Sequence, residues 1–298
     1  MRIIVLGSAA GGGFPQWNSA CPVGRRAWQG DPAARWRSQC SLAVSAADEH
    51  WVLLNASPDL RQQILATPAL HPQRAPRHSP IVAVVLTNGD IDHVAGLLTL
   101  RESQRFALYA TRAILDVLAA NPIFDALNPD YVDRRPLALD TAVEVAGLSI
   151  LPFAVPGKVA LYMERGEPVI GAESEDTIGL ELRAAGTRFC FVPGCAGMTA
   201  ALGARLQGAP LVFFDGTLWT DDEMVQSGTG AKTGGRMGHI SVSGPGGSLA
   251  AFASLSVGRK IYIHINNTNP MLLDDSPERA AAERAGWEVA YDGMELCL

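Results

Sequence analysis

Between Val84 and Gly96 the chain reads VVLTNGDIDHVAG, and this stretch is the strongest indication of fold and chemistry in the sequence. It begins with an apolar run typical of a buried strand. Polar side chains then follow at alternate positions, with a histidine directly after the last of them: Asn88, Asp90, Asp92 and His93. Ligands of α/β folds gather at the carboxyl ends of strands, and carboxylate, amide and imidazole groups are donors for divalent metals, so the segment predicts a metal site at a sheet edge. In the alternative interpretation, Asp92 caps the following helix and His93 is an ordinary buried histidine.

Similar apolar, β-branched runs recur along the whole chain and predict further strands. They are Ile3–Leu6, Trp51–Leu54, Ile81–Leu86, Ser149–Phe153, Ile178–Arg183, Arg188–Val192, Leu211–Phe214 and Ile261–Ile265. Helical patterns lie between several of them, at Thr111–Ala120, Gly244–Leu255 and Pro277–Ala285. The turn 184–187 (AAGT) predicts a hairpin between two neighbouring strands, which indicates mixed rather than purely parallel sheets. We therefore expect one α/β domain over residues 1–298.

Composition limits the classes of partner. The 298 residues are 48% hydrophobic and 18% charged, and the net charge of -6 leaves no broad basic face for nucleic acid. The longest apolar runs are about six residues where a bilayer span needs roughly 20, so we expect a protein that is not membrane-integral. The short apolar N-terminus does not resemble a signal peptide, and five cysteines are an odd, sparse set, so we expect reduced thiols in the cytoplasm.

Two segments have turn-forming residues without periodicity. Gly7–Gly13 (GSAAGGG) matches neither nucleotide-binding glycine pattern and predicts a tight backbone turn. Ser227–Gly247 is glycine-rich and contains His239. Long irregular segments of this kind in compact domains are usually functional loops or disordered.

Thr87–Gly96 resembles the T-H-x-H-x-D-H-x-x-G signature of the metallo-β-lactamase superfamily, with Asn88 and Asp90 in place of its first two histidines. Within that superfamily the chain is similar to the PqqB family of pyrroloquinoline quinone (PQQ) biosynthesis proteins. The similarity is carried by the opening block and by three later segments: Gly7–Asn18, Asp215–Trp219, Met237–Ser241 and His264–Pro270. The resemblance implies a metallo-β-lactamase-like αββα sandwich of two mixed β-sheets, with a metal site on its upper edge.

The resemblance also shows where this chain departs from the superfamily. Lys158 stands where the superfamily has its third histidine, and Cys195 where it has the bridging aspartate. A protonated lysine cannot bind a metal, and a cysteine binds only as thiolate, so a dinuclear hydrolytic centre is not expected. The residues left for a mononuclear site are Asp90, Asp92, His93, His264 and Asp215, the last either as a ligand or as an anchor for one.

Two histidines and one carboxylate with open positions suit Fe(II), with O₂ as cosubstrate, whereas Zn(II) on the same donors would favour hydrolysis. PqqB-like chains often carry a cysteine cluster near the N-terminus, where this chain has Ser19, Cys21 and Gly24. With one thiol of three, we expect no structural zinc at the Cys21 loop. We expect that loop to be held instead by packing of Trp17, Pro22 and Trp28.

For function, the resemblance implies a role in making PQQ from a peptide whose glutamate and tyrosine side chains become cross-linked. The first hypothesis is iron-dependent hydroxylation of the tyrosine-derived ring. In it, His239 is a proton donor or substrate ligand, and Lys158 pairs with a carboxylate of the small anionic precursor. The alternatives are a non-catalytic carrier that passes PQQ or its precursor toward the periplasm, and a residual hydrolase. Other PQQ biosynthesis proteins are the expected partners, and a homodimer stays open.

Overall fold

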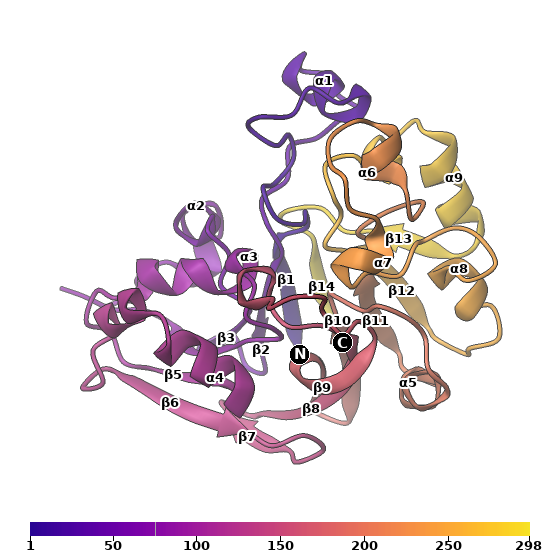
Figure 1. Ribbon diagram of the computed structural model, residues 1–298. Helices are drawn as coiled ribbons and strands as arrows, with labels where there is room; N and C mark the ends of the chain where they lie inside the picture. The colour runs from indigo at the N-terminus through magenta and orange to yellow at the C-terminus, as the bar shows by residue number, and fades with distance from the viewer. Residues whose placement is uncertain (75) are drawn as a thin grey trace.

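Two mixed β-sheets form the centre of the computed structural model, which describes residues 1–74 and 76–298 (Figure 1). The first seven-stranded sheet has the order β14 (Glu295–Cys297), β1 (Arg2–Gly7), β2 (Ser41–Ser45), β3 (Trp51–Leu54), β4 (Ile81–Val85), β5 (Phe106–Thr111) and β6 (Val132–Leu137). The second has the order β13 (Trp287–Val289), β12 (Arg259–Ile263), β11 (Leu211–Asp215), β10 (Thr187–Val192), β9 (Ala172–Ala184), β8 (Leu148–Gly157) and β7 (Val143–Val145). In each sheet one half is parallel and the other antiparallel, as the sequence predicts.

Helices cover the outer face of each sheet (Figure 1). Those on or near the first sheet are α2 (Leu60–Ala66), α3 (Ile91–Val94) and α4 (Arg112–Ala119); those around the second are α5 (Ala200–Leu206), α6 (Glu223–Gln226), α7 (Gly234–Met237), α8 (Ser248–Ala251) and α9 (Pro277–Arg284). The N-terminal α1 (Pro22–Trp28) stands apart at the top of the molecule. Short 3₁₀ turns occupy Pro68–Leu70, Ala95–Leu100, Pro122–Ala126, Leu161–Met163 and Pro270–Leu272.

The alternation of side chains along the strands produces these layers. In β1, Ile3 and Val5 face the core between the sheets, whereas Ile4 and Leu6 face α2 and its neighbours. In β11 the same alternation places Phe213 between the sheets and Phe214 against the helices of the second sheet. Strands buried on both faces read as continuous apolar runs, which is why they stand out in the sequence. The prediction of an αββα sandwich is confirmed.

The hairpin between β9 and β10 is confirmed in register, with Arg183 opposite Arg188. Its tight turn places Ala185 and Gly186 at φ values of 49° and 79°, the left-handed conformation that two-residue hairpins require. The Ser276 side chain caps α9 by accepting a hydrogen bond from the backbone amide of Arg279.

The helix predicted at Gly244–Leu255 is wrong in its extent, because only Ser248–Ala251 is α-helical. The sequence GPGG at 244–247 supplies residues that disfavour a helix interior, so the helix cannot begin earlier. The structure also contains strands that the sequence pattern did not predict. One is β6, an edge strand with charged residues and Pro136, which lacks the apolar signature of the central strands.

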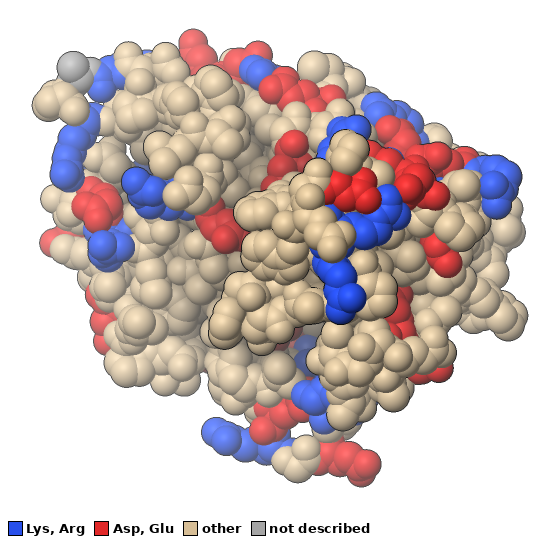
Figure 2. Space-filling model, turned by 90° about the horizontal axis from the view of Figure 1, so that it is seen from above, with Lys and Arg blue, Asp and Glu red and all other residues tan. Residues whose placement is uncertain are grey.

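No helix among the described residues is long and apolar enough to cross a membrane. Seen from above, Lys and Arg side chains are interspersed with Asp and Glu side chains over the surface (Figure 2). This face therefore carries mixed charge.

A candidate metal centre and its pocket

The candidate site lies where strands of both sheets end. Asp92 and His93 are on α3, shortly after β4; Asp215 is the last residue of β11; His264 directly follows β12. A pocket of about 290 Å³ opens over them. Its lining is Ala10, Gly11, Gln16, Asn88, Asp90, Asp92, Lys158, Leu161, Glu164, Thr217, Met224, Lys232, Arg236, Met237, His239, His264 and Asn266.

The glycine of the motif explains how α3 reaches its position. The amide of Gly96 donates to the carbonyl of Ala56 at 2.9 Å. A Cβ at this position would lie 2.0 Å from the carbonyl oxygen of Ser57. Only glycine allows this close approach, which seats the segment carrying Asp92 and His93 against the end of β3.

Three side chains converge as the sequence predicts for a metal. Ligand atoms of Asp92, His93 and His264 all lie within 4.8 Å of one another. Oδ2 of Asp92 lies 3.0 Å from Nε2 of His264 and 3.9 Å from Nε2 of His93. The two imidazole rings meet edge to face, with centroids 5.2 Å apart. Residues 172 positions apart in the chain are thus brought to one point.

The tautomer of His93 follows from its hydrogen bonds. Nδ1 lies 2.7 Å from Oδ1 of Asn88, which only accepts, so Nδ1 carries the proton. Nε2 is then a lone pair, and this buried atom has no hydrogen-bond partner among the described residues. Burial lowers the pKa of His93 to about 4, so the ring is neutral at pH 7. A buried, neutral and unpartnered imidazole nitrogen facing a carboxylate is what a metal site provides.

The charge state of Asp92 suits the same site. Burial alone would raise its pKa, but His93 and the hydrogen bond to His264 outweigh burial and lower the pKa below the ordinary value. Asp92 is therefore an anion at neutral pH. His264 itself has a φ of 59°, a left-handed conformation that is rare for a residue with a side chain and is typical of functional sites.

The carboxylate of Asp215 accepts several hydrogen bonds beneath the site. Oδ2 accepts from the amide of Cys195 at 2.8 Å and lies 2.6 Å from Nδ1 of His239. Oδ1 accepts from the amide of Thr217 at 3.0 Å and from its hydroxyl at 2.6 Å. With four donors around one carboxylate, Asp215 has little capacity left for a metal, and this geometry favours the role of anchor. A second metal-compatible group, of Asp215, His239 and His264, shares His264 with the first.

His239 follows the short helix α7 and its ring stacks on that of His264, with centroids 5.2 Å apart. Burial alone would lower the pKa of His239, but the charge of Asp215 and the hydrogen bond to it raise the pKa above the ordinary value. Since Nδ1 bonds to Asp215, Nε2 is the nitrogen left for the pocket that His239 lines.

Three of the four departures from the superfamily pattern line the pocket, and Cys195 does not. Asn88, Asp90 and Lys158 all line it, although Asp90 belongs to neither metal-compatible group among the described residues. Nζ of Lys158 lies 3.1 Å from Oε1 of Glu164, so this lysine already has an anionic partner. Cys195 is a neutral thiol, since burial raises its pKa to about 12, and its Sγ bonds to the carbonyl of Gly197.

The N-terminal loop differs from our expectation. Trp17 is 82% exposed, so the predicted packing by this residue is wrong. Instead Trp28 and Trp36 pack edge to face, with centroids 5.5 Å apart. Sγ of Cys21 caps α1 by accepting from the amide of Gly24. The loop is therefore held by a helix cap and by a different aromatic pair.

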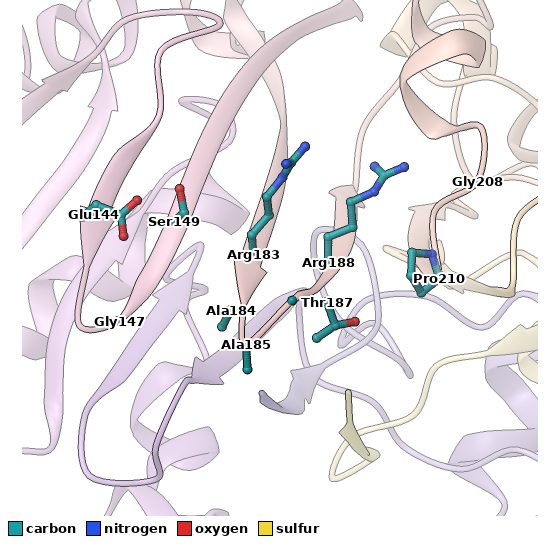
Figure 3. Close-up of a pocket in the computed structure, with 11 residues that line it drawn as sticks. Glu144, Gly147, Ser149, Arg183, Ala184, Ala185, Thr187, Arg188, Gly208 and Pro210 are labelled. Carbon is teal, nitrogen blue, oxygen red and sulfur yellow. The ribbon is translucent and has the colours of Figure 1, made fainter.

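A second hollow lies at the opposite end of the second sheet (Figure 3). It is formed around the β9–β10 hairpin and the start of β11, with Arg183 and Arg188 extending beside each other. Both arginines pair with the buried Glu181, at 2.5 and 2.6 Å. Among the described residues that line this hollow there is no histidine or cysteine, so it is not a candidate for the metal chemistry.

Sequence reasoning missed three charged residues of the pocket: Glu164, Lys232 and Arg236. Glu164 receives both nitrogens of the Arg236 guanidinium at 3.2 and 2.9 Å, and these contacts lower its pKa to about 2. Glu164 directly follows a short 3₁₀ turn, Lys232 lies in irregular backbone and Arg236 lies in the four-residue helix α7, so no periodic pattern marks any of them. Thr217 was visible in the sequence as part of DGT (215–217), a segment equally compatible with an ordinary turn.

Comparison with known proteins shows which family the chain belongs to. Residues 50–265 match the family described as Beta-lactamase superfamily domain. Coenzyme PQQ synthesis protein B of Xanthomonas oryzae pv. oryzae (strain MAFF 311018) is 61% identical over 100% of both chains. The chain belongs to the coenzyme PQQ synthesis protein B family. The protein of that name from Methylobacterium sp. (strain 4-46) is 56% identical, again over 100% of both chains.

Solved structures agree with the membership of this PQQ synthesis family. The crystal structure of Zn(2+)-bound PqqB from Methylobacterium extorquens has a TM-score of 0.98 and 54% identity, covering 100% of both chains. A diphosphatase from the PhnP family has a TM-score of 0.70 at 21% identity, over 100% of this chain and 97% of that one, and shows the shared fold alone.

Proposed function

We propose that this chain acts in PQQ biosynthesis as a mononuclear iron-dependent oxygenase, which hydroxylates the tyrosine-derived ring of a cross-linked glutamate–tyrosine precursor. The observation that carries the proposal is the convergence of Asp92, His93 and His264, with a buried and unpartnered Nε2 on His93. Two imidazoles and one carboxylate with open positions are the ligand set of non-haem Fe(II) oxygenases. The family name supplies the pathway.

The donors at the site fit a single divalent cation. His93 is neutral and Asp92 anionic, and both can bind without losing a proton. Asp215 serves as the anchor of His239 in this proposal, and Asp90 is left free for another role. Iron bound here would supply the site at which O₂ is activated. The M. extorquens relative is described with zinc, so zinc is the alternative metal that the experiment must separate from iron.

The residues at the superfamily's other metal position argue against a dinuclear hydrolytic centre. A dinuclear centre needs ligands for two cations about 3.5 to 4 Å apart. On the second-metal side this chain has an amide, a carboxylate and a lysine: Asn88, Asp90 and Lys158. Lys158 is paired with Glu164, and its ammonium disfavours a further cation nearby.

His239 is proposed as the proton-handling group. Its ring is oriented by Asp215 and lines the pocket above the metal ligands. The pKa of His239 is raised, so a larger fraction is protonated near pH 7 and can donate to an oxygen of the reacting ring. Lys158, Lys232 and Arg236 give the pocket a cationic side that suits a small anionic precursor.

The test is anaerobic loading of the purified protein with Fe(II), with Zn(II) or with no metal, followed by O₂ uptake with the cross-linked precursor and an added reductant. We expect uptake and ring hydroxylation with Fe(II) only, loss of both in Asp92→Ala and His93→Ala, and no change in His50→Ala, an exposed histidine. His239→Gln should retain the metal and lose about 10²- to 10⁴-fold in rate.

Other outcomes would identify the other functions. Binding of PQQ without turnover under any metal would favour a carrier. Turnover with zinc in the absence of O₂ would favour a hydrolase. Full activity in both ligand variants would refute the metal assignment.

A further inference from the structure

Asp90 is a carboxylate in the pocket with one unused oxygen. Oδ1 accepts from the amide of Leu161 at 2.9 Å. Among the described residues, Oδ2 has no hydrogen-bond or ion-pair partner, and it is not one of the unsatisfied atoms sealed from solvent, so it is open to the cavity that Asp90 lines. A carboxylate oxygen that faces a cavity without a partner is available to a ligand.

The position of Asp90 is fixed from both sides. Its amide donates to Oδ1 of Asn88 at 3.0 Å, which closes the turn before α3. The hydroxyl of Tyr162 donates to the carbonyl of Gly89 at 2.8 Å, which ties this turn to the segment after β8. Rigid support of this kind is what a binding group needs, because it lets the group meet a ligand without reorganising.

A cation without a partner lines the same pocket. Glu164 is the anionic partner of both Lys158, at 3.1 Å, and Arg236, at 2.9 Å. Lys232, from the segment just before α7, lines the cavity and has no ion-pair partner within 4 Å among the described residues. The pocket thus offers one free carboxylate and one free ammonium in addition to the metal ligands.

From this pairing we propose that Asp90 is the receptor for a protonated amine of the substrate and Lys232 the receptor for its carboxylate. The ligand class is a free amino acid whose aromatic ring reaches the metal site. Acylation of the amine would remove the charge that Asp90 recognises and add bulk beside Leu161, so acylated substrates are rejected. This inference rests on the proposed function only in placing the aromatic ring at the metal site. Binding of the amine and the carboxylate can be measured without turnover.

The test uses the zinc-loaded protein, in which no O₂ chemistry takes place, and four probes: L-tyrosine, tyramine, N-acetyltyramine and 3-(4-hydroxyphenyl)propionate. Affinities are measured by calorimetry or by ligand-observed NMR. In the wild-type protein we expect tyramine to bind at least tenfold more tightly than N-acetyltyramine, as expected for one charged hydrogen bond. Equal affinity for these two probes would overturn the proposal without any variant.

Variants then assign the two receptors. Asp90→Asn keeps an acceptor for the amide of Leu161 and should weaken tyramine and L-tyrosine about tenfold or more, with the propionate unaffected. Lys232→Met should weaken L-tyrosine and the propionate and leave tyramine unaffected. Asp116→Asn, an exposed carboxylate on α4, is the matched control and should change none of them.

Metal content separates this proposal from its main competitor. Asp90→Asn should retain one zinc per chain. A loss of zinc in this variant would make Asp90 a metal ligand and overturn the inference. If the probes do not bind as expected, the head-group proposal is wrong, and O₂ uptake by the iron form still tests the oxygenase proposal. If O₂ uptake fails, the oxygenase proposal is wrong, and the probe affinities still test the head-group proposal.

Discussion

The hydroxyl of Thr217 lies 2.9 Å from Nδ1 of His264. The hydroxyl of Thr217 has one proton, and two acceptors lie within hydrogen-bond distance of it: Oδ1 of Asp215 at 2.6 Å and the carbonyl of His264 at 2.9 Å. Thr217 therefore accepts from Nδ1–H of His264, so Nε2 of that ring, which lies 3.0 Å from Oδ2 of Asp92, is the nitrogen that would bind a cation. One threonine thus fixes the tautomer of a metal-ligand candidate and connects it to the anchor of His239.

Thr217→Val should weaken metal binding about 10- to 100-fold, the usual cost of losing a group that orients a ligand. The volume of the side chain is kept and only the hydroxyl is lost. The measurement is zinc affinity by chelator competition. Thr217→Ser should restore most of the affinity; if it binds zinc as weakly as the valine variant, the hydroxyl is not the orienting group.

Asn88→Ala should weaken zinc binding by a similar factor, because Nδ1 of His93 loses its acceptor at 2.7 Å. Asn88→Asp should bind at least as tightly as the wild type, since a carboxylate accepts the same proton more strongly. Asn128→Ala, at an exposed position, is the control. An unchanged affinity in Asn88→Ala would show that the ring is oriented by other contacts.

Glu223 predicts a pH dependence of stability. Burial raises its pKa from 4.5 to about 7, although Thr268 and the amide of Trp219 lower it in part. The folded carboxyl binds its proton more tightly than the unfolded one, so its contribution is fully present below pH 4.5 and is lost as the pH rises through 7. The full loss is on the order of 3 kcal/mol.

Urea unfolding of the wild type and Glu223→Gln, from pH 5 to pH 8, measures this contribution. The difference between the two free energies of unfolding should move in favour of the variant as the pH rises, by on the order of 2 kcal/mol. A difference independent of pH would show that Glu223 titrates with an ordinary pKa in the folded protein.

Phe214 tests the outer core of the second sheet. Its ring packs edge to face on Phe252 with centroids 4.8 Å apart and lies 6.4 Å from Trp287. Phe214→Ala should lower the free energy of unfolding by about 3–5 kcal/mol. Ile123→Ala, at a side chain that is 61% exposed, should change it by less than about 0.5 kcal/mol. Equal costs for the two would mean that this layer contributes little to stability.

Local sequence determined the parts of the protein that depend on neighbours in the chain. Most central strands could be predicted because both of their faces are buried and their sequences are continuously apolar, whereas the central strands β2 and β5 were not predicted. The edge strand β6 could not be predicted, because its exposed positions carry charged residues and its sequence pattern resembles that of a loop. The pair Asp92–His93 could be predicted as part of a site because both residues lie directly after such a strand, in a pattern shared with the superfamily.

What only the tertiary structure decided is which of these side chains meet. The contact of Asp92 with His264 spans 172 positions, and that of Glu164 with Arg236 spans 72. Each depends on how two sheets pack and on where irregular segments cross, and neither is encoded by a local period. The sequence therefore named the donors, whereas the packing of the sandwich placed Asp92, His93 and His264 at one point and left Asp90 beside them, because direction and distance between side chains exist only once the chain is folded.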